Sequence, residues 1–340
     1  MKVSLLASAV ALSVFSSAIA AEGRTPGSCL IYPIHRSAPG WYSILNVTNT
    51  NLQPATPQSF GGTTNIQFNY VNTIPNPADS QIPLDCFIVD RVESLTPGDT
   101  LSVLTSWHNA ANQEGYVVVA AQDPSEFKTE WQFDYLVGSE LVVNAAGGMY
   151  SINAIPLSSR PDCLPPKEEC EVVGFDNALM QDLGNELILD CFLAVADSQL
   201  TILSPMVDEV IFPNIILKFD IFNDNEFQLS ATKTFRCWFE ESLSDVSLVF
   251  DENFLANNTP HDPTTLDIDG DYQGDLETGW ALIKSAEAFT QNDSFYGLGI
   301  HGAITDGPTS FIDGGRLLWE PQGYWGPSKA TYVCEGLDNL

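Results

Sequence analysis

Residues 213–239 read PNIILKFDIFNDNEFQLSATKTFRCWF, and this stretch indicates the fold. Leu217, Phe219 and Ile221 alternate with polar residues, the period of two expected of a strand with one buried face. A turn rich in Asn and Asp follows, and apolar residues then alternate again. The stretch therefore predicts a β-hairpin.

A weaker copy of this hairpin lies 151 positions upstream, over residues 65–88. Further matches follow in the same order along both halves, with two glycine pairs at a second constant spacing of 164 positions. The matched pairs are Phe68 with Phe219, Cys86 with Cys237, Gly115 with Gly279, Gly138 with Gly302, and, at a different spacing, Cys29 with Cys191. Ordered matches of this kind indicate an internal repeat.

The predicted fold class is all-β, with two tandem antiparallel β-sandwich domains that are immunoglobulin-like or jelly-roll-like. Short alternating strands separated by turn residues favour sandwiches, and no strong helical periodicity occurs in the first half. A proline-rich stretch between the halves would interrupt any strand ladder. The expected boundaries are a signal peptide at 1–20, a first domain at 21–157, a Pro/Cys linker at 158–170, and a second domain at 171–340 with an acidic loop insertion.

The first 20 residues resemble an export signal. Lys2 precedes a short apolar run over residues 4–15, and Ala18 and Ala20 form a small-x-small cleavage site. The run is too short to cross a bilayer, which takes about 20 apolar residues, so no transmembrane segment is expected. The predicted location is extracellular, cell-surface or periplasmic.

The charge of the chain is strongly acidic, with 13 Lys and Arg residues against 44 Asp and Glu residues and a net charge of −31. A surface of this sign repels phosphate backbones, which argues against nucleic acid as a partner. It suits a solubilising surface or the binding of Ca²⁺. The hydrophobic content of 44% is enough for well-packed cores.

The seven cysteines of an exported chain favour disulfides over metal clusters. Aligning the repeats predicts two equivalent bonds, each joining the first strand of a half to the return strand of its hairpin. The remaining three cysteines leave two alternatives open, a small linker ring or a bond that pins the C-terminus by Cys334. The predicted pairs are Cys29–Cys86 and Cys191–Cys237, with Cys163–Cys170 as the ring.

An acidic loop in the second half has the composition of a metal site. Residues 267–277 read DIDGDYQGDLE, with carboxylates alternating around two glycines. Calcium takes six to eight oxygen ligands in a flexible geometry, which such a loop can supply. The alternative is a solvated acidic loop without metal. The predicted Ca²⁺ ligands are Asp267, Asp269, Asp271 and Asp275, and no other cofactor is expected.

Two further sets of residues are candidates for chemistry or binding. Trp319, Tyr324 and Trp325 form an aromatic cluster that either stacks on sugars or fills a partner's pocket, or else caps the core. His108 is a candidate general base because histidine titrates near neutral pH. No nucleophile motif accompanies it, so a histidine held by a hydrogen bond is favoured, and no catalytic residue is assigned.

Three segments carry a family resemblance: LNVTNTN at residues 45–51, the long stretch 86–124, and FDYLVG at residues 133–138. The chain resembles exported bacterial proteins of two β-sandwich domains that have no assigned activity. The resemblance implies export and an all-β fold, and it implies nothing about a substrate.

The expected function is that of an exported, non-enzymatic protein for cell-surface, matrix or adhesive assembly. The first alternative is a carbohydrate-binding protein, assisted by Ca²⁺. The second alternative is a secreted hydrolase whose carboxylates are dispersed in the sequence. Other surface proteins or a polysaccharide are the partners that these hypotheses imply.

Overall fold

The computed structural model describes most of the N-terminal half of the chain and the sheet-forming parts of the C-terminal half. The described residues are 25–37, 39–78, 83–109, 111, 113–125, 131–145, 148–159, 172–175, 178–181, 184–193, 198–205, 214–223, 226–251, 254–255, 258, 278–286, 299–305 and 315–318. The predicted signal peptide and residues 160–170 of the predicted linker lie outside them. The domain boundaries therefore stay a prediction.

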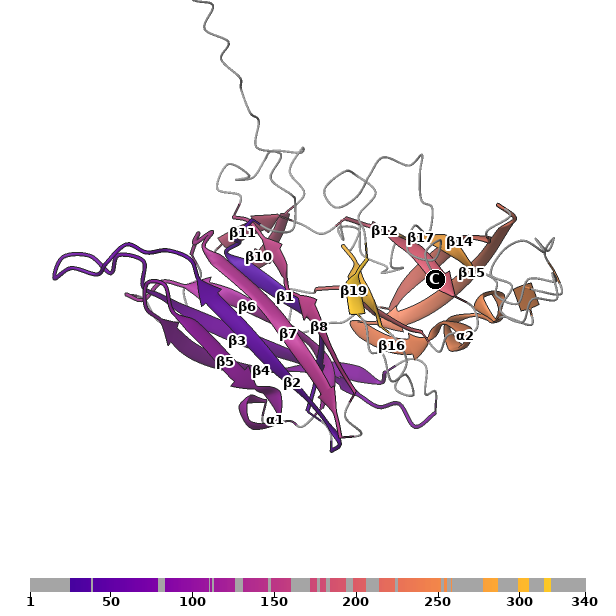
Figure 1. The fold of residues 1–340 in the computed structure, drawn as a ribbon, viewed down its shortest axis with the longest axis horizontal. Helices are drawn as coiled ribbons and strands as arrows, with labels where there is room; N and C mark the ends of the chain where they lie inside the picture. Colours follow the sequence, from indigo (N-terminus) through magenta and orange to yellow (C-terminus); the bar gives the residue numbers. More distant parts are fainter. Residues whose placement is uncertain are drawn as a thin grey trace, which may run out of the picture.

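The N-terminal half forms two antiparallel sheets (Figure 1). The first has the order β4-β3-β6-β1-β9 and the second the order β5-β2-β7-β8. The strands are β1 (Cys29–Arg36), β2 (Trp41–Asn49), β3 (Thr64–Ile74), β4 (Asp85–Leu95), β5 (Thr100–Leu104), β6 (Glu114–Gln122), β7 (Leu136–Asn144), β8 (Met149–Asn153) and β9 (Ile155–Leu157), and helix α1 (Thr105–His108) follows β5.

The C-terminal half likewise forms two main sheets, here of four strands each, with the orders β12-β17-β14-β15 and β16-β13-β18-β19. The elements are β12 (Glu186–Leu193), β13 (Gln199–Leu203), β14 (Asn214–Asn223), β15 (Gln228–Arg236), β16 (Trp238–Ser242), α2 (Leu243–Val246), the 3-10 helix η1 (Leu248–Phe250), β17 (Thr278–Ala286), β18 (His301–Thr305) and β19 (Gly315–Leu317). A separate two-stranded sheet joins β10 (Val172–Phe175) to β11 (Ala178–Gln181). The all-β sandwich class is confirmed.

The hairpin predicted from residues 213–239 is present as β14 and β15, which pair antiparallel from Asn214 opposite Arg236 to Phe222 opposite Gln228. Alternate residues of β14 are buried, including Leu217 and Phe219. The other face of the strand is half-buried or exposed. The period-two pattern therefore predicted the correct face.

The two halves share one strand arrangement. The first sheet, without β9, has the strand order β4-β3-β6-β1, and its C-terminal counterpart read in the same direction has the order β15-β14-β17-β12. The strands therefore correspond one to one. The second sheet corresponds in the same way, with β5, β2, β7 and β8 matching β16, β13, β18 and β19. Each half also places a four-residue helix directly after β5 or β16. The repeat inferred from the sequence thus has a structural counterpart.

The glycine matches occupy equivalent positions in the two halves. Gly115 lies opposite Asn72, as Gly279 lies opposite Asn223. Each glycine lies against the strand facing it, where a Cβ would approach a main-chain oxygen to 1.9 and 2.3 Å. A side chain at either position would clash with the neighbouring strand, so both halves need glycine there.

The cysteine matches do not occupy equivalent positions, and the disulfides predicted from them are wrong. Cys86 lies near the turn of its hairpin, opposite Thr73, whereas Cys237 follows the far end of β15. The structure joins Cys86 to Cys237, with a Cα–Cα distance of 6.8 Å. Since a cysteine forms one disulfide, this bond replaces both predicted pairs. The connection after β3 is longer than the connection after β14, so a constant offset misaligned the return strands.

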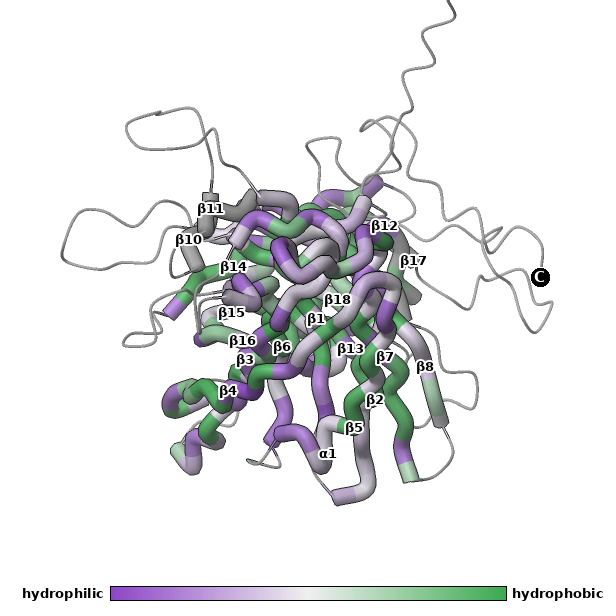
Figure 2. The backbone as a smooth tube through the Cα atoms, turned by 90° about the vertical axis from the view of Figure 1, so that its left-hand side faces the viewer, coloured by the Kyte–Doolittle hydropathy of each residue, from purple (hydrophilic) through white to green (hydrophobic). Residues whose placement is uncertain are grey.

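Each half has a core between its two sheets. In the N-terminal half, Tyr32 and Phe68 of the first sheet pack with Leu45 and Val47 of the second. The C-terminal half buries its own cluster, which includes Phe219 and Ile202. Figure 2 shows apolar residues recurring along the central strands β1, β6 and β13. The architecture is therefore two pairs of facing sheets, each with its own apolar interior.

A third apolar cluster joins the halves, and we call this contact the seam. It combines Cys29 and Ile31 of β1 and Val118 of β6 with Leu203 and Trp238 of the C-terminal half. β6 is consequently buried on both faces, because one face meets the N-terminal core and the other meets the seam. Its sequence, EGYVVVAAQ, is the continuous apolar run typical of a strand covered on both sides.

Candidate functional site

The connection between β2 and β3 projects from the N-terminal half, and we call residues 51–63 the arm (Figure 1). Near its tip, Thr56 and Ser59 exchange main-chain hydrogen bonds of 2.8 and 3.2 Å. Closer to the base, the Gly62 N–H donates to the carbonyl of Gln53 over 2.8 Å. The arm is thus a narrow hairpin with hydrogen bonds between its two sides.

Two buried asparagines fix the base of the arm. The Asn49 amide donates to the carbonyls of Gly62 and Thr96 over 2.7 and 3.0 Å, and its side-chain oxygen accepts from the Asn51 N–H. The Asn51 side chain in turn accepts from the N–H of Gln53 over 3.0 Å. Asparagine suits this role because its side chain both donates and accepts. The direction of the arm is therefore set by buried hydrogen bonds.

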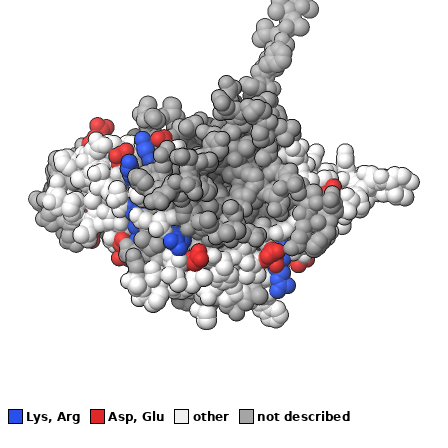
Figure 3. Space-filling view, turned by 180° about the vertical axis from the view of Figure 1, so that it is seen from behind, with Lys and Arg blue, Asp and Glu red and all other residues white. Residues whose placement is uncertain are grey.

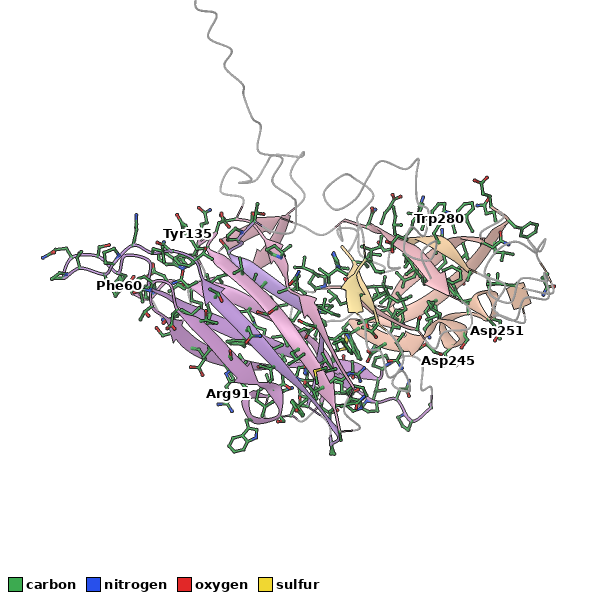
Figure 4. All side chains as sticks on the ribbon, viewed as in Figure 1. Phe60, Arg91, Tyr135, Asp245, Asp251 and Trp280 are labelled. Atoms are coloured by element: carbon green, nitrogen blue, oxygen red, sulfur yellow. A yellow bond between two sulfur atoms is a disulfide. The ribbon has the colours of Figure 1, made fainter. Side chains whose placement is uncertain are left out.

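The arm carries exposed apolar side chains. Leu52 is 76% exposed and Phe60 is 51% exposed. Tyr135, 45% exposed, lies beside the base, where its carbonyl accepts from the Thr50 N–H over 2.8 Å. Figure 4 shows Phe60 and Tyr135 at the same end of the N-terminal half. These residues form an apolar surface on a held scaffold.

The arm is also uncharged. No Asp, Glu, Lys or Arg occurs between Arg36 and Asp79, although the whole chain carries a net charge of −31. In Figure 3 the arm extends at the right as a white protrusion, while charged side chains lie elsewhere on that face. The long-range repulsion between two acidic molecules is therefore weakest where their arms approach.

A second cluster of interest is a group of buried polar residues on and next to β1, beside the seam, and we call it the polar cluster: His35, Arg36, Glu140 and Glu240. The Arg36 guanidinium holds both carboxylate oxygens of Glu240 at 2.5 and 2.6 Å and lies 4.3 Å from the centroid of the Trp41 ring. Burial acts to lower the pKa of Arg36, but the Glu240 carboxylate more than offsets this, so the pKa ends above its ordinary value. The pair fastens β1 to β16 across the seam.

Burial shifts the pKa values of the other two members of the polar cluster in the directions that favour their neutral forms. Glu140 of β7 is fully buried, and burial raises the pKa of its carboxyl well above the ordinary value. Burial lowers the pKa of the His35 imidazole to about 3. The His35 ring packs edge-on against Tyr70 with centroids 5.3 Å apart. The polar cluster thus contains one ion pair and two titratable groups whose neutral forms are favoured by burial.

His108 lies at the edge of the N-terminal sandwich, where it bridges two strands. Its Nδ1 is 2.6 Å from the Tyr70 hydroxyl, and its Nε2 is 3.4 Å from a carboxylate oxygen of Glu93. Burial lowers the pKa of the imidazole, and Glu93 offsets part of this effect. Both ring nitrogens are therefore engaged, and the predicted hydrogen-bonded histidine is confirmed. Tyr70 itself is fully buried and cannot reach a substrate.

Most site residues predicted from the sequence lie outside the described part of the chain. This applies to the acidic loop with Asp267, Asp269, Asp271 and Asp275 and to the aromatic cluster of Trp319, Tyr324 and Trp325. It also applies to Cys163, Cys170 and Cys334. Those predictions stay predictions. Within the described ranges, no group of three or more His, Cys, Asp or Glu side chains is arranged to hold a metal ion.

The described helices are short. The α-helices α1 and α2 span four residues each, far below the roughly 20 residues that a bilayer-spanning helix needs.

Comparison with known proteins gives no relative for this chain. No family description, no curated protein and no solved structure matches it. Function must therefore be argued from the arm, the polar cluster and the surface of this chain.

Sequence reasoning missed the arm and the polar cluster. The uncharged stretch between Arg36 and Asp79 was a signal that could have indicated the arm. The polar cluster had no such signal, because Arg36 and Glu240 are far apart in sequence and meet only when the halves pack.

Proposed function

We propose that the protein is an exported, non-enzymatic component of a cell-surface or matrix assembly, and that copies associate through the arm. The observation that carries this proposal is the uncharged, apolar arm on an acidic protein. Leu52 and Phe60 supply apolar area, and the Asn49 hydrogen bonds hold the arm in place before contact. A surface ordered in advance loses less entropy on association.

The acidic charge of the rest of the molecule favours end-on contact between copies. Two molecules of net charge −31 repel each other over most orientations, and this repulsion decreases as salt screens it. Because the arm has no charged residues, two molecules that touch through their arms bring no like charges together at the contact. Association is therefore expected to strengthen as the salt concentration rises.

The test is the molar mass in solution, measured by light scattering over a range of protein concentrations at about 20 and 500 mM salt, which change the Debye length severalfold. The expected result is a mass above that of the monomer at high concentration and high salt. Phe60→Asp and Leu52→Asp place a carboxylate on the arm and should return the protein to monomers.

Leu248→Asp is the matched control, because Leu248 is 72% exposed but belongs to η1 of the C-terminal half. It should associate like the unaltered protein. A monomer at every concentration and salt level, or equal losses in the Leu248 and arm variants, would contradict the proposal.

A further inference from the structure

Helix α1 presents Trp107 almost entirely to solvent. Its side chain is 85% exposed, more than any other large hydrophobic residue among the described ones. Exposing an indole forgoes the favourable burial of a large apolar surface. Such an arrangement needs a reason beyond folding.

The position of Trp107 is fixed by buried residues on both sides. The Thr105 hydroxyl donates to the carbonyl of Arg36 over 2.5 Å and accepts from the Ser43 N–H over 3.0 Å. The Asn109 amide donates to the Asn72 side chain over 2.7 Å. Both anchors are fully buried. The indole is therefore carried by a turn whose main chain is held in place.

The equivalent helix of the C-terminal half shows that the fold does not require this tryptophan. In α2, Leu243 and Val246 turn into the apolar core, and Asp245 occupies the position of Trp107. Asp245 accepts a hydrogen bond of 2.7 Å from the Ser242 hydroxyl. The same structural element is thus built with a short acidic residue where α1 has an exposed indole.

Charged groups lie near α1, around the residue that follows Trp107. His108, the next residue, holds the Glu93 carboxylate at 3.4 Å, and the charge of Arg91 is near enough to lower the pKa of His108. Glu93 keeps 43% of its side chain exposed. Figure 4 shows Arg91 on the lower side of the N-terminal half. An exposed carboxylate and an exposed guanidinium therefore lie close to His108, which is on the same short helix that carries the exposed indole.

We propose that Trp107, Glu93 and Arg91 form a binding platform for a neutral polysaccharide. A sugar ring has an apolar C–H face, which fits the negative face of an indole, and a rim of hydroxyls, which fits carboxylate and guanidinium hydrogen bonds. A neutral polymer is also the class of polymer that the net charge of −31 does not repel.

This platform is separate from the arm. The arm follows Asn49, whereas α1 follows Leu104, and in the pairing of β2 with β5 these residues lie at opposite ends. Failure of one proposal therefore leaves the other standing, and the two sets of variants can be measured side by side.

The experiment is native electrophoresis in gels containing hydroxyethyl cellulose, dextran or mannan, compared with a gel that contains no polymer. The unaltered protein is expected to be retarded by at least one of these neutral polymers. Trp107→Ala and Trp107→Asp, the latter copying α2, should weaken binding about tenfold or more, as loss of a central aromatic contact does. Glu93→Gln should weaken it by a smaller factor.

Leu248→Asp is the control, because Leu248 is exposed on η1 of the C-terminal half and belongs to neither the platform nor the arm, and it should be retarded like the unaltered protein. Thermal melting should be nearly unchanged in both Trp107 variants, since the side chain is exposed, which separates lost binding from lost folding. Mobility unaffected by all three polymers, or equal retardation of the Trp107 variants and the unaltered protein, would overturn the platform.

Discussion

The polar cluster has three members in the N-terminal half and one, Glu240, in the C-terminal half, and the equivalent position in the opposite half is apolar or uncharged in each case. The first strand of each half has a bulge, after Tyr32 in β1 and after Leu189 in β12. Beyond the bulge, His35 pairs with Gly115, and Phe192 pairs with the equivalent Gly279. The register likewise equates Arg36 with Leu193, Glu140 with Ile304, and Glu240 with Ser102.

This difference separates what the fold needs from what the contact between halves needs. The C-terminal half builds the same sheets with Phe192 and Ile304 at two of these positions, so the sandwich itself does not require titratable groups there. The polar residues gather where β1 and β7 approach β16 of the other half. This place assigns Arg36, Glu140 and Glu240 to the seam. His35 instead packs against Tyr70 of the N-terminal core.

The burial of the two central strands supports the same distinction. β6 is buried along both faces, whereas β17, its counterpart, alternates between buried residues such as Ala281 and Ile283 and half-buried ones such as Lys284. The C-terminal half thus covers the outer face of the N-terminal sheet and keeps its own corresponding face partly solvated. The repeats are similar in topology and unequal in packing.

The largest effect is expected from breaking the covalent link of the seam. Cys86→Ser and Cys237→Ser should each lower the free energy of unfolding by about 5 kcal/mol, the chain-entropy estimate for a closed loop of 151 residues. Denaturant titration of the oxidised proteins measures this loss. The double variant should lose no more than either single one, and additive losses would show that the two cysteines do not pair.

The second-largest loss of stability is expected when Arg36 is replaced by the leucine found at the equivalent position of the C-terminal half. Arg36→Leu copies Leu193 and leaves the Glu240 carboxylate buried without its cation, which should cost about 3–5 kcal/mol. Adding Glu240→Ser, which copies Ser102, should recover part of this loss. A single variant as stable as the unaltered protein would mean that the pair does not fasten the halves.

His35 should make stability depend on acid. The unfolded chain takes up a proton near pH 6.5, whereas the folded imidazole stays neutral down to about pH 3. Above pH 6.5 neither state binds this proton, so His35 has no effect on stability. As the pH falls, proton uptake favours the unfolded chain and lowers the free energy of unfolding, by on the order of 2–3 kcal/mol at pH 4.5. His35→Phe, which copies Phe192, should reduce the slope of the urea midpoint between pH 6.5 and 4.5. An unchanged slope would contradict the assignment.

The smallest effect is expected at Glu140, with the opposite sign. The raised pKa means that the unfolded chain loses its proton first as pH rises, so the folded state is progressively penalised above the ordinary carboxyl pKa. Glu140→Gln removes this penalty and should stabilise the protein at pH 7, with little effect at pH 4. Thermal melting at the two pH values measures the difference, and a destabilised variant at pH 7 would refute it.

Local patterns in the sequence predicted the fold well. Alternation in residues 213–239 predicted the central hairpin, and the Gly115 and Gly138 matches identified equivalent strand positions, because a close strand approach excludes any side chain. The disulfides failed because the connection after β3 is longer than the one after β14, which shifted Cys86 relative to Cys237. Arg36 and Glu240 were out of reach of sequence reasoning because their contact exists only after the halves pack.

The stretch 171–186, between the two halves' main sheets, shows the same limit at short range. Its Ala-Leu-Met-Gln segment consists of residues that favour helices, yet β10 and β11 pair as a hairpin, with Val172 opposite Gln181. Strand propensity of the two consecutive valines at the start of β10 outweighs the helix formers that follow. Local propensity is therefore a weaker guide here than alternation over a long strand.

Peptide mapping without reduction tests the central claim most directly, namely that the two repeats are fastened to each other across the seam. The account predicts one linked pair of peptides that contains Cys86 and Cys237. Peptides that link Cys29 to Cys86 and Cys191 to Cys237 would instead show a disulfide within each repeat, and would contradict a covalent link between the repeats.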